Sequence, residues 1–154
     1  MSNLFLSIKI IAGILCLWIF SSFVPPTVEE AFSLEVKVSG LRNSHGQVVF
    51  ALYNKQDAIP DKEFNSYFRK ELGEIYNGTS AVVFDNLIPG DYAVSILHDE
   101  NRDEKIKKGF FLPKEGIGFS NFKSIDPTNK PSFDKASINI KGDTSVQVSI
   151  LYFN

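Results

Sequence analysis

The chain has 154 residues, of which 44% are hydrophobic and 22% are charged, and its formal net charge is −2. This length suits one domain, and the composition is that of a globular protein. The charge is too small to indicate a partner, and the sequence shows no basic stripe of the kind that nucleic-acid-binding proteins carry. We therefore expect no nucleic-acid partner.

The first 24 residues differ from the rest of the chain. Lys9 is the one charge before an apolar run from Ile10 to Phe20, and this is the layout of a secretory signal. The run is shorter than the roughly 20 apolar residues that span a bilayer comfortably. No pair of small residues is well placed for cleavage after it. Residues 1–24 are thus expected to be a signal peptide, or a membrane anchor that meets the bilayer through residues 4–24.

The expected compartment follows from this leader. We expect the protein to be exported to the periplasm or the extracellular space, or to be held at the membrane by its N-terminus if the leader is not cut. Cys16, the single cysteine, lies inside the leader. The remaining domain therefore has no disulfide, no thiolate metal site and no cysteine nucleophile.

A linker and one domain are expected after the leader. Residues 25–32, PPTVEEAF, combine two prolines with two glutamates and predict a linker, while the domain is expected to occupy residues 33–154 without a further boundary. The domain begins with strict alternation of apolar and polar residues, the pattern of a half-buried strand. The apolar positions are Leu34, Val36 and Val38, and the polar positions between them are Glu35 and Lys37.

Further strands are predicted along the domain. Residues 47–53, QVVFALY, are apolar on both faces, which is typical of a central strand. Other β-rich segments follow, and turns such as 43–46, 88–91 and 141–144 separate the strands. These β-rich segments are 72–76, 80–87, 92–98, 136–140 and 145–153.

The segment 55–72 fits two interpretations. Phe64 and Phe68 lie one helical turn apart, and Asp61 is placed to cap a helix. A short helix and an irregular loop agree with this pattern about equally well.

The number and spacing of these segments predict the fold class. Seven or eight short strands with regular turns indicate an all-β protein, an immunoglobulin-like or transthyretin-like β-sandwich preceded by the hydrophobic signal or anchor helix. Tyr92 follows the turn that contains Pro89 and Gly90, which is the pattern of a tyrosine corner. In such a corner the tyrosine hydroxyl bonds to backbone, so we expect a structural role for these three residues.

Four separated motifs resemble one known family. In order, they are VSGLRNSHGQVVFALYN, FDNLIPGDYAVSILHDEN, LPKEGIGFSN and PSFDKASI. They are similar to an uncharacterised bacterial family, the domain of unknown function 2141, over roughly residues 33–153. The resemblance implies a small exported protein with a β-sandwich fold, and it implies no activity. This chain departs from the family in the loop after His98, where Arg102 and Glu104 replace the usual glycines and Lys107 replaces an acid.

That loop suggests a calcium site as one hypothesis. Asp99, Asn101 and Asp103 stand at positions 1, 3 and 5 of an EF-hand count, which is a spacing that supplies oxygen ligands. The glycine expected at position 6 is Glu104, and the glutamate expected at position 12 is Phe110. The alternative is a solvated loop in which Asp and Asn side chains bond to their own backbone. The mismatches favour this alternative, and we expect no other cofactor.

The segment after the acidic loop combines glycines with aromatic residues. Its phenylalanines are Phe110, Phe111, Phe119 and Phe122. One interpretation is a loop whose phenylalanines plug the open end of the sandwich, which is the commoner use of such residues. The other is a ligand platform, and the two are compatible if the plug lines a groove.

The ligand-binding site is expected at this end of the sandwich. The residues that we expect to form it are His98, Asp99, Asn101, Asp103, Lys114, Glu115, Ser120 and Asn121.

No catalytic set is recognisable in the sequence. His98 shares a strand face with Val94 and Ile96, so a buried neutral imidazole with one backbone partner is expected, whereas His45 lies in a turn and is expected to be solvated. Neither histidine is near a nucleophile motif. Asp99 with Glu115 could form the carboxylate pair of a glycoside hydrolase, but the sequence does not give their separation.

These observations favour one function over two alternatives. We expect an exported, non-enzymatic β-sandwich that binds an unknown ligand or an envelope protein. The first alternative is a structural or assembly protein of the envelope, which would expose an apolar patch or a strand edge. The second is a hydrolase that uses the acidic loop.

Overall fold

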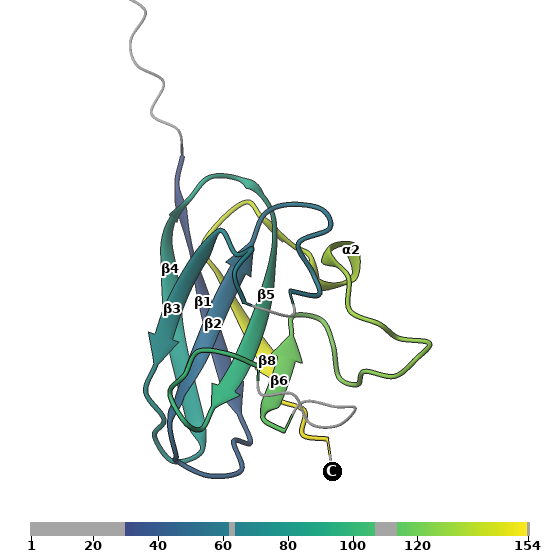
Figure 1. The fold of residues 1–154 in the computed structure, drawn as a ribbon. Helices are drawn as coiled ribbons and strands as arrows, with labels where there is room; N and C mark the ends of the chain where they lie inside the picture. The colour runs from purple at the N-terminus through teal and green to yellow at the C-terminus, as the bar shows by residue number, and fades with distance from the viewer. Residues whose placement is uncertain (1–29, 62–63, 107–113, 154) are drawn as a thin grey trace, which may run out of the picture.

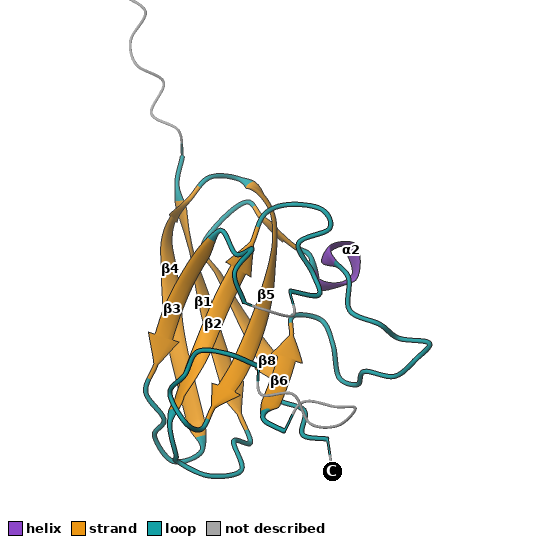
Figure 2. Ribbon diagram, in the orientation of Figure 1, coloured by secondary structure: helices purple, strands orange, loops and turns teal. Residues whose placement is uncertain are grey.

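The computed structural model describes residues 30–61, 64–106 and 114–153, which form two β-sheets and one short helix (Figure 1). The predicted leader, residues 1–24, lies outside the described residues. Within the part of the chain that is described, no helix is long and apolar enough to cross a membrane. The all-β prediction is confirmed, because the described secondary structure is eight strands and a single four-residue helix (Figure 2).

The first sheet, sheet A, has three strands in the order β4-β1-β8. The central strand β1 pairs with β4 in antiparallel and with β8 in parallel orientation. The strand bounds are β1 Phe32–Ser39, β4 Thr79–Leu87 and β8 Thr144–Ser149. Sheet A therefore joins the beginning of the domain to its end.

The second sheet, sheet B, has the order β3-β2-β5-β6, and β7 pairs with the first residues of β5. All of its pairings are antiparallel. The bounds are β2 Gln47–Tyr53, β3 Arg69–Gly73, β5 Gly90–Asp99, β6 Gly116–Phe119 and β7 Ile138–Ile140. The short helix α2 (Phe133–Ala136) precedes β7 and begins at Ser132, whose hydroxyl accepts from the backbone of Lys135.

The main core lies between the two sheets. The predicted alternation in β1 is confirmed, since Leu34, Val36 and Val38 are at most 1% exposed. These residues form one cluster with inward-facing residues of β2, β4 and β5, so the sheets pack face to face. Whether the sandwich is of the immunoglobulin-like or transthyretin-like type stays a prediction.

A second core covers the outer face of sheet B. Every residue of β2 is buried, as expected for a central strand, because Val49, Ala51 and Tyr53 face away from sheet A into this second cluster. Phe119 and Phe122 belong to it, so the aromatic plug covers a face of sheet B and not the open end of the sandwich. The predicted positions Phe110 and Phe111 lie outside the described residues.

The domain carries its own core. Both clusters, with the side chains packed against them, are built from residues between Phe32 and Ile150. The region that follows residue 29 therefore contains the apolar contacts that stabilise it, and a protein of residues 30–154 is expected to fold as a unit.

Several elements differ from the prediction. The described part of 55–72 contains no helix, and β3 begins at Arg69, three residues before the predicted strand. Strand β6 and helix α2 were not predicted. Both are only four residues long, which is too short for a periodic pattern to be recognisable.

Tyr92 forms the predicted hydrogen bond of a tyrosine corner. Its hydroxyl donates to the backbone oxygen of Ile88 at 3.0 Å, across the turn that contains Pro89 and Gly90. The ring is 3% exposed and belongs to the main core. The bond thus ties the turn between β4 and β5 to the packed interior.

Replacement of Tyr92 by phenylalanine tests this corner. We expect Tyr92→Phe to lower the free energy of unfolding by about 1 kcal/mol, the usual net value of one hydrogen bond, because the ring stays packed and only the hydroxyl is lost. Urea unfolding of residues 30–154 measures the change. Tyr76→Phe is the matched control, since Tyr76 is 77% exposed, and equal losses in both variants would contradict the assignment.

Candidate functional site

His98 is the last core-facing residue of β5 and is fully buried. Its Nε2 lies 3.0 Å from the backbone oxygen of His45, and its Nδ1 lies 2.7 Å from the hydroxyl of Tyr152. A carbonyl oxygen can only accept, so Nε2 carries the proton and Nδ1 accepts from the tyrosine. Burial lowers the pKa of His98 below its ordinary value of 6.5. The imidazole is therefore neutral, with one backbone partner, as the strand pattern predicted.

Tyr152 connects His98 to an ion pair. Its hydroxyl accepts from the backbone nitrogen of Arg42 at 3.1 Å, and the Arg42 guanidinium lies 4.8 Å from the centre of its ring. That guanidinium forms a two-pronged ion pair with Glu100 and also donates to the backbone oxygen of Lys114. We call His98, Tyr152, Arg42 and Glu100 the His98 cluster. It ties the β1–β2 loop, the end of β5, residue 114 and the C-terminal segment together.

The hydrogen bond from Arg42 is the main cause that lowers the pKa of Glu100 to about 2. A second hydrogen bond from the Asn43 side chain acts in the same direction. Glu100 is therefore ionised at neutral pH. Its charge is held against Arg42, whose pKa is raised chiefly by the same hydrogen bond.

Asp99 organises the acidic loop from inside. It is fully buried, and its carboxylate accepts from the backbone nitrogens of Asp103 and Glu104 at 3.1 and 2.9 Å and from the Gln47 amide at 3.1 Å. Asp103 accepts in turn from Asn101 and from the backbone of Lys105. The Asp side chains of this loop thus bond to the loop's own backbone, which is the arrangement that the alternative to a metal site predicted.

Calcium at Asp99, Asn101 and Asp103 stays a prediction. In the described residues, no group of three or more histidine, cysteine, aspartate or glutamate side chains is arranged to hold a metal ion. The oxygens of Asp99 that would bind calcium already accept hydrogen bonds from the protein.

The other predicted site residues separate into two groups. Lys114 and Glu115 lie beside the His98 cluster, and Glu115 is only 3% exposed. Ser120 and Asn121 lie beyond the opposite end of β6, and at the rise of a strand Ser120 is about 16 Å from Glu115. There Ser120 bonds to Val94 and to the backbone oxygen of Ala136, and Asn121 bonds to the backbone oxygen of Ser137. The structure thus does not bring all the predicted residues together.

Because of the His98 cluster, we expect the free energy of unfolding to change with pH in two ranges, one set by His98 and one by Glu100. The folded state disfavours protonated His98, so the unfolded state binds more protons, and stability is lost as pH falls below 6.5 towards the lower folded-state pKa. Arg42 opposes protonation of His98, while Asp99 and Glu100 favour it and burial outweighs them. We expect His98→Gln to remove the change in the first range, measured as the urea midpoint of residues 30–154 against pH. An unchanged slope near pH 6.5 in this variant would contradict the assignment.

Glu100 governs the second range. Its depressed pKa means that its stabilising effect is complete above 4.5 and is lost as pH falls from 4.5 towards about 2. We expect Glu100→Gln to flatten this acidic limb and leave the limb near pH 6.5 in place, which the same titration measures. A variant that loses both limbs together would show that the two residues do not act separately.

Gly116 makes room for Tyr152. A Cβ atom at this position would lie 2.4 Å from the tyrosine ring, so any larger residue displaces it. We expect Gly116→Ala to lower the free energy of unfolding by about 1–3 kcal/mol, the usual cost of overpacking. Gly142→Ala is the control, because no atom lies within 4 Å of the added Cβ there, and its effect is expected within about 0.5 kcal/mol. Equal effects of the two substitutions, measured by urea unfolding, would contradict the packing argument.

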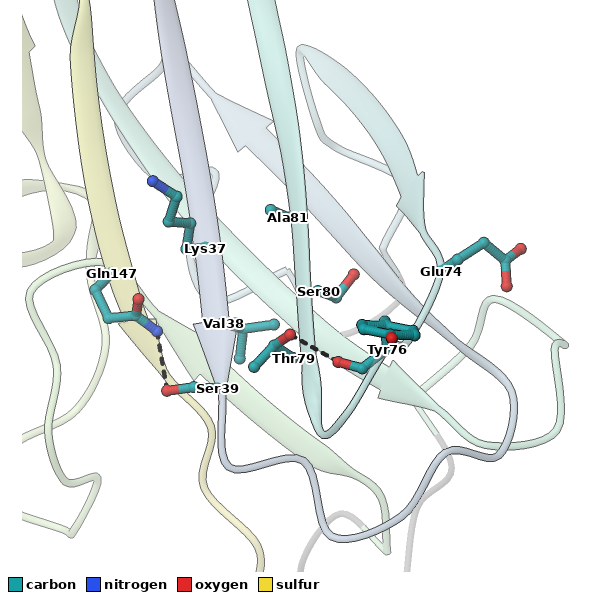
Figure 3. A pocket seen from close by; sticks show the side chains of 9 residues that line it. All are labelled: Lys37, Val38, Ser39, Glu74, Tyr76, Thr79, Ser80, Ala81 and Gln147. Atoms are coloured by element: carbon teal, nitrogen blue, oxygen red, sulfur yellow. Dashed lines mark hydrogen bonds between the residues drawn. The ribbon is translucent and has the colours of Figure 1, made fainter.

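An open trough lies on sheet A, and none of the predicted site residues lines it. It has a volume of about 380 Å³ and runs over the lower ends of β1 and β4 (Figure 3). This volume falls within the range of small-molecule sites, roughly 300–1,000 Å³. Its lining residues are Lys37, Val38, Ser39, Glu74, Tyr76, Thr79, Ser80, Ala81 and Gln147.

Strand register assembles this trough. Lys37 pairs with Ala81 on β4 and with Gln147 on β8, so three strands present their outward side chains side by side. Lys37 and Gln147 stand on one side of β4, and Tyr76 stands on the other side (Figure 3). Ala81 lies between these longer side chains, and we infer that its small size leaves the trough open.

A tight turn positions Tyr76. Asn77 and Gly78 both have positive φ angles, 49° and 71°, which is the conformation of a type I′ hairpin turn. Tyr76 and Thr79 close this turn through reciprocal backbone hydrogen bonds of 2.9 and 3.0 Å. The Tyr76 side chain is 77% exposed, so it is fixed at its backbone and free at its ring.

Ser80 forms part of the floor and faces inward. It is 6% exposed, and its hydroxyl has no hydrogen-bond partner within the described residues. The hydroxyl lies against Gly73, where an added Cβ atom would be 2.3 Å from it. Ser80 therefore shapes the junction of β3 and β4 and is not a group of the open face.

The sequence contained one signal for the trough. Tyr76 directly precedes the Asn-Gly pair, so an exposed aromatic residue beside a hairpin turn was predictable. The partners of Tyr76 were not predictable, because Lys37 and Gln147 come from opposite ends of the domain and meet through the parallel pairing of β1 and β8.

Comparison with known proteins gives one match. The model of a family described as "Uncharacterized protein conserved in bacteria (DUF2141)" matches residues 36–148. The match extends from β1 to β8 and confirms the resemblance that the four motifs indicated. No curated protein and no solved structure matches the chain.

Proposed function

The chain belongs to the DUF2141 family of uncharacterized bacterial proteins, and we propose that it is an exported, non-enzymatic β-sandwich module that binds its ligand in the trough of sheet A. The trough is the observation that carries this proposal. It is an open concave surface on a sheet face, and a rigid two-sheet scaffold holds its lining residues. Export is proposed from the leader, in which Lys9 precedes an apolar run.

The His98 end supports binding without catalysis. His98 has both ring nitrogens engaged by Tyr152 and His45, so neither is available as a general base. Asp99 accepts hydrogen bonds on both carboxylate oxygens and is fully buried, so it is poorly placed to act as an acid or a nucleophile. We therefore assign this end of the sandwich to stability and the trough to ligand binding.

A fragment titration tests whether the trough binds a ligand. Amide NMR spectra of ¹⁵N-labelled residues 30–154 are recorded during titration with a library of small polar and aromatic fragments. We expect shifts to cluster at residues 37–39, 74–81 and 147. Shifts at the His98 cluster alone, or at no localised surface, would overturn the assignment.

A matched pair of variants makes this test specific. Ala81→Leu places a larger side chain on the trough floor, and we expect it to abolish the clustered shifts without loss of stability because Ala81 is exposed. Val83→Leu lies on the same outward face of β4 and outside the trough, so it should respond like the wild type. A wild-type response in Ala81→Leu would contradict binding in the trough.

Export is tested separately with the full chain. We expect a C-terminally tagged protein to be recovered outside the cytoplasm of a bacterial host, cut near residue 24 or anchored with its domain accessible to added protease. Recovery of the uncut chain inside the cytoplasm would contradict export, and it would leave the trough assignment unaffected.

A further inference from the structure

We infer that the trough of sheet A binds a neutral carbohydrate, with the Tyr76 ring as the stacking surface. This inference rests on the proposed function, because it names the ligand class of the same trough. It follows from three properties of the lining residues: an exposed aromatic ring, balanced charge, and polar groups that both donate and accept hydrogen bonds.

The aromatic ring is the first property. Tyr76 is the most exposed of the large hydrophobic residues in the described chain, and it borders a concave polar surface. The face of an aromatic ring carries partial negative charge and attracts slightly positive groups such as the C–H bonds of a sugar ring. A single exposed tyrosine has no special meaning by itself. Tyr76, however, lines the trough, so a ligand in the trough would contact its ring.

The charge balance is the second property. The trough contains one cation, Lys37, and one anion, Glu74. The Lys37 ammonium lies 2.7 Å from the Glu35 carboxylate, so its charge is largely compensated. Glu74 lies 3.4 Å from the Arg102 guanidinium. A phosphate or an acidic peptide would need uncompensated basic groups, so a neutral ligand fits this surface better.

The polar groups are the third property. Gln147 can donate and accept through its amide, and Ser39 and Thr79 can do so through their hydroxyls. The Gln147 amide donates to the Ser39 hydroxyl at 3.2 Å, and the Thr79 hydroxyl donates to the Tyr76 carbonyl at 2.7 Å, which holds these groups in place. Sugar hydroxyls also donate and accept, so they can pair with such groups in either direction. An apolar ligand would not use the hydrogen-bonding capacity that these groups still have towards solvent.

Titration with defined oligosaccharides tests this inference. Cellohexaose, maltohexaose and chitohexaose are added separately to ¹⁵N-labelled residues 30–154, up to about 10 mM, so that weak complexes are detected. We expect at least one of them to shift the amides of residues 37–39, 74–81 and 147 in a saturable way.

Variants at Tyr76 separate stacking from other contacts. Tyr76→Ala should weaken the binding by about tenfold, and Tyr76→Phe should retain it, because the stacking face remains. Phe68→Ala is the control, since Phe68 is also exposed, at 46%, but lies outside the trough. Binding that is unchanged in Tyr76→Ala, or lost equally in Phe68→Ala, would overturn the inference.

The combined outcomes distinguish the two proposals. If fragments bind in the trough and none of the three oligosaccharides does, the carbohydrate inference fails and the binding proposal stands. If neither fragments nor oligosaccharides shift the trough amides, both proposals fail.

Discussion

The paired strands β2 and β5 are buried on both faces, and the rest of the structure depends on this double burial. Their register runs from Gln47 opposite Asp99 to Tyr53 opposite Ala93, and every residue in β2 is buried. Sheet A covers one face of the pair, and the loops after β2 and β6 cover the other. Because backbone groups inside such a ladder cannot reach water, they must pair with neighbouring strands, and β3, β6 and β7 complete the sheet around them.

Double burial also explains the polar chemistry at the end of β5. His98 and Asp99 continue the strand into a region where water cannot reach their side chains, so each needs protein partners. His98 finds them in Tyr152 and in the backbone of His45, and Asp99 finds them in the loop that follows it. His98 and Asp99, which the sequence suggested as site residues, therefore bond to the segments that meet at this end of the core.

The two sheets consequently have different roles. The outer face of sheet B is covered at β2 and β5, because a second apolar cluster packs on the side that sheet A leaves open. The outer face of sheet A carries mostly polar and charged side chains and meets solvent, so a ligand can approach it there. The three strands of sheet A come from the beginning, middle and end of the domain, and their alignment puts Lys37, Ala81 and Gln147 in one row. A binding surface on this face therefore depends on the complete fold.

The sequence by itself determined the strand pattern and several local structures. Alternation at Leu34, Val36 and Val38, continuous apolarity in residues 47–53, and the turn before Tyr92 are local patterns, and each has a direct physical consequence for burial or hydrogen bonding. The neutral state of His98 also followed from its parity with Val94 and Ile96. The tertiary structure alone decided which polar residues face water. Ser120 lies beyond the end of β6 that is far from His98, because β6 runs antiparallel to β5 and pairs Gly116 with His98. Lys37 lies beside Gln147 because β1 and β8, which are more than a hundred residues apart in the sequence, pair in that register.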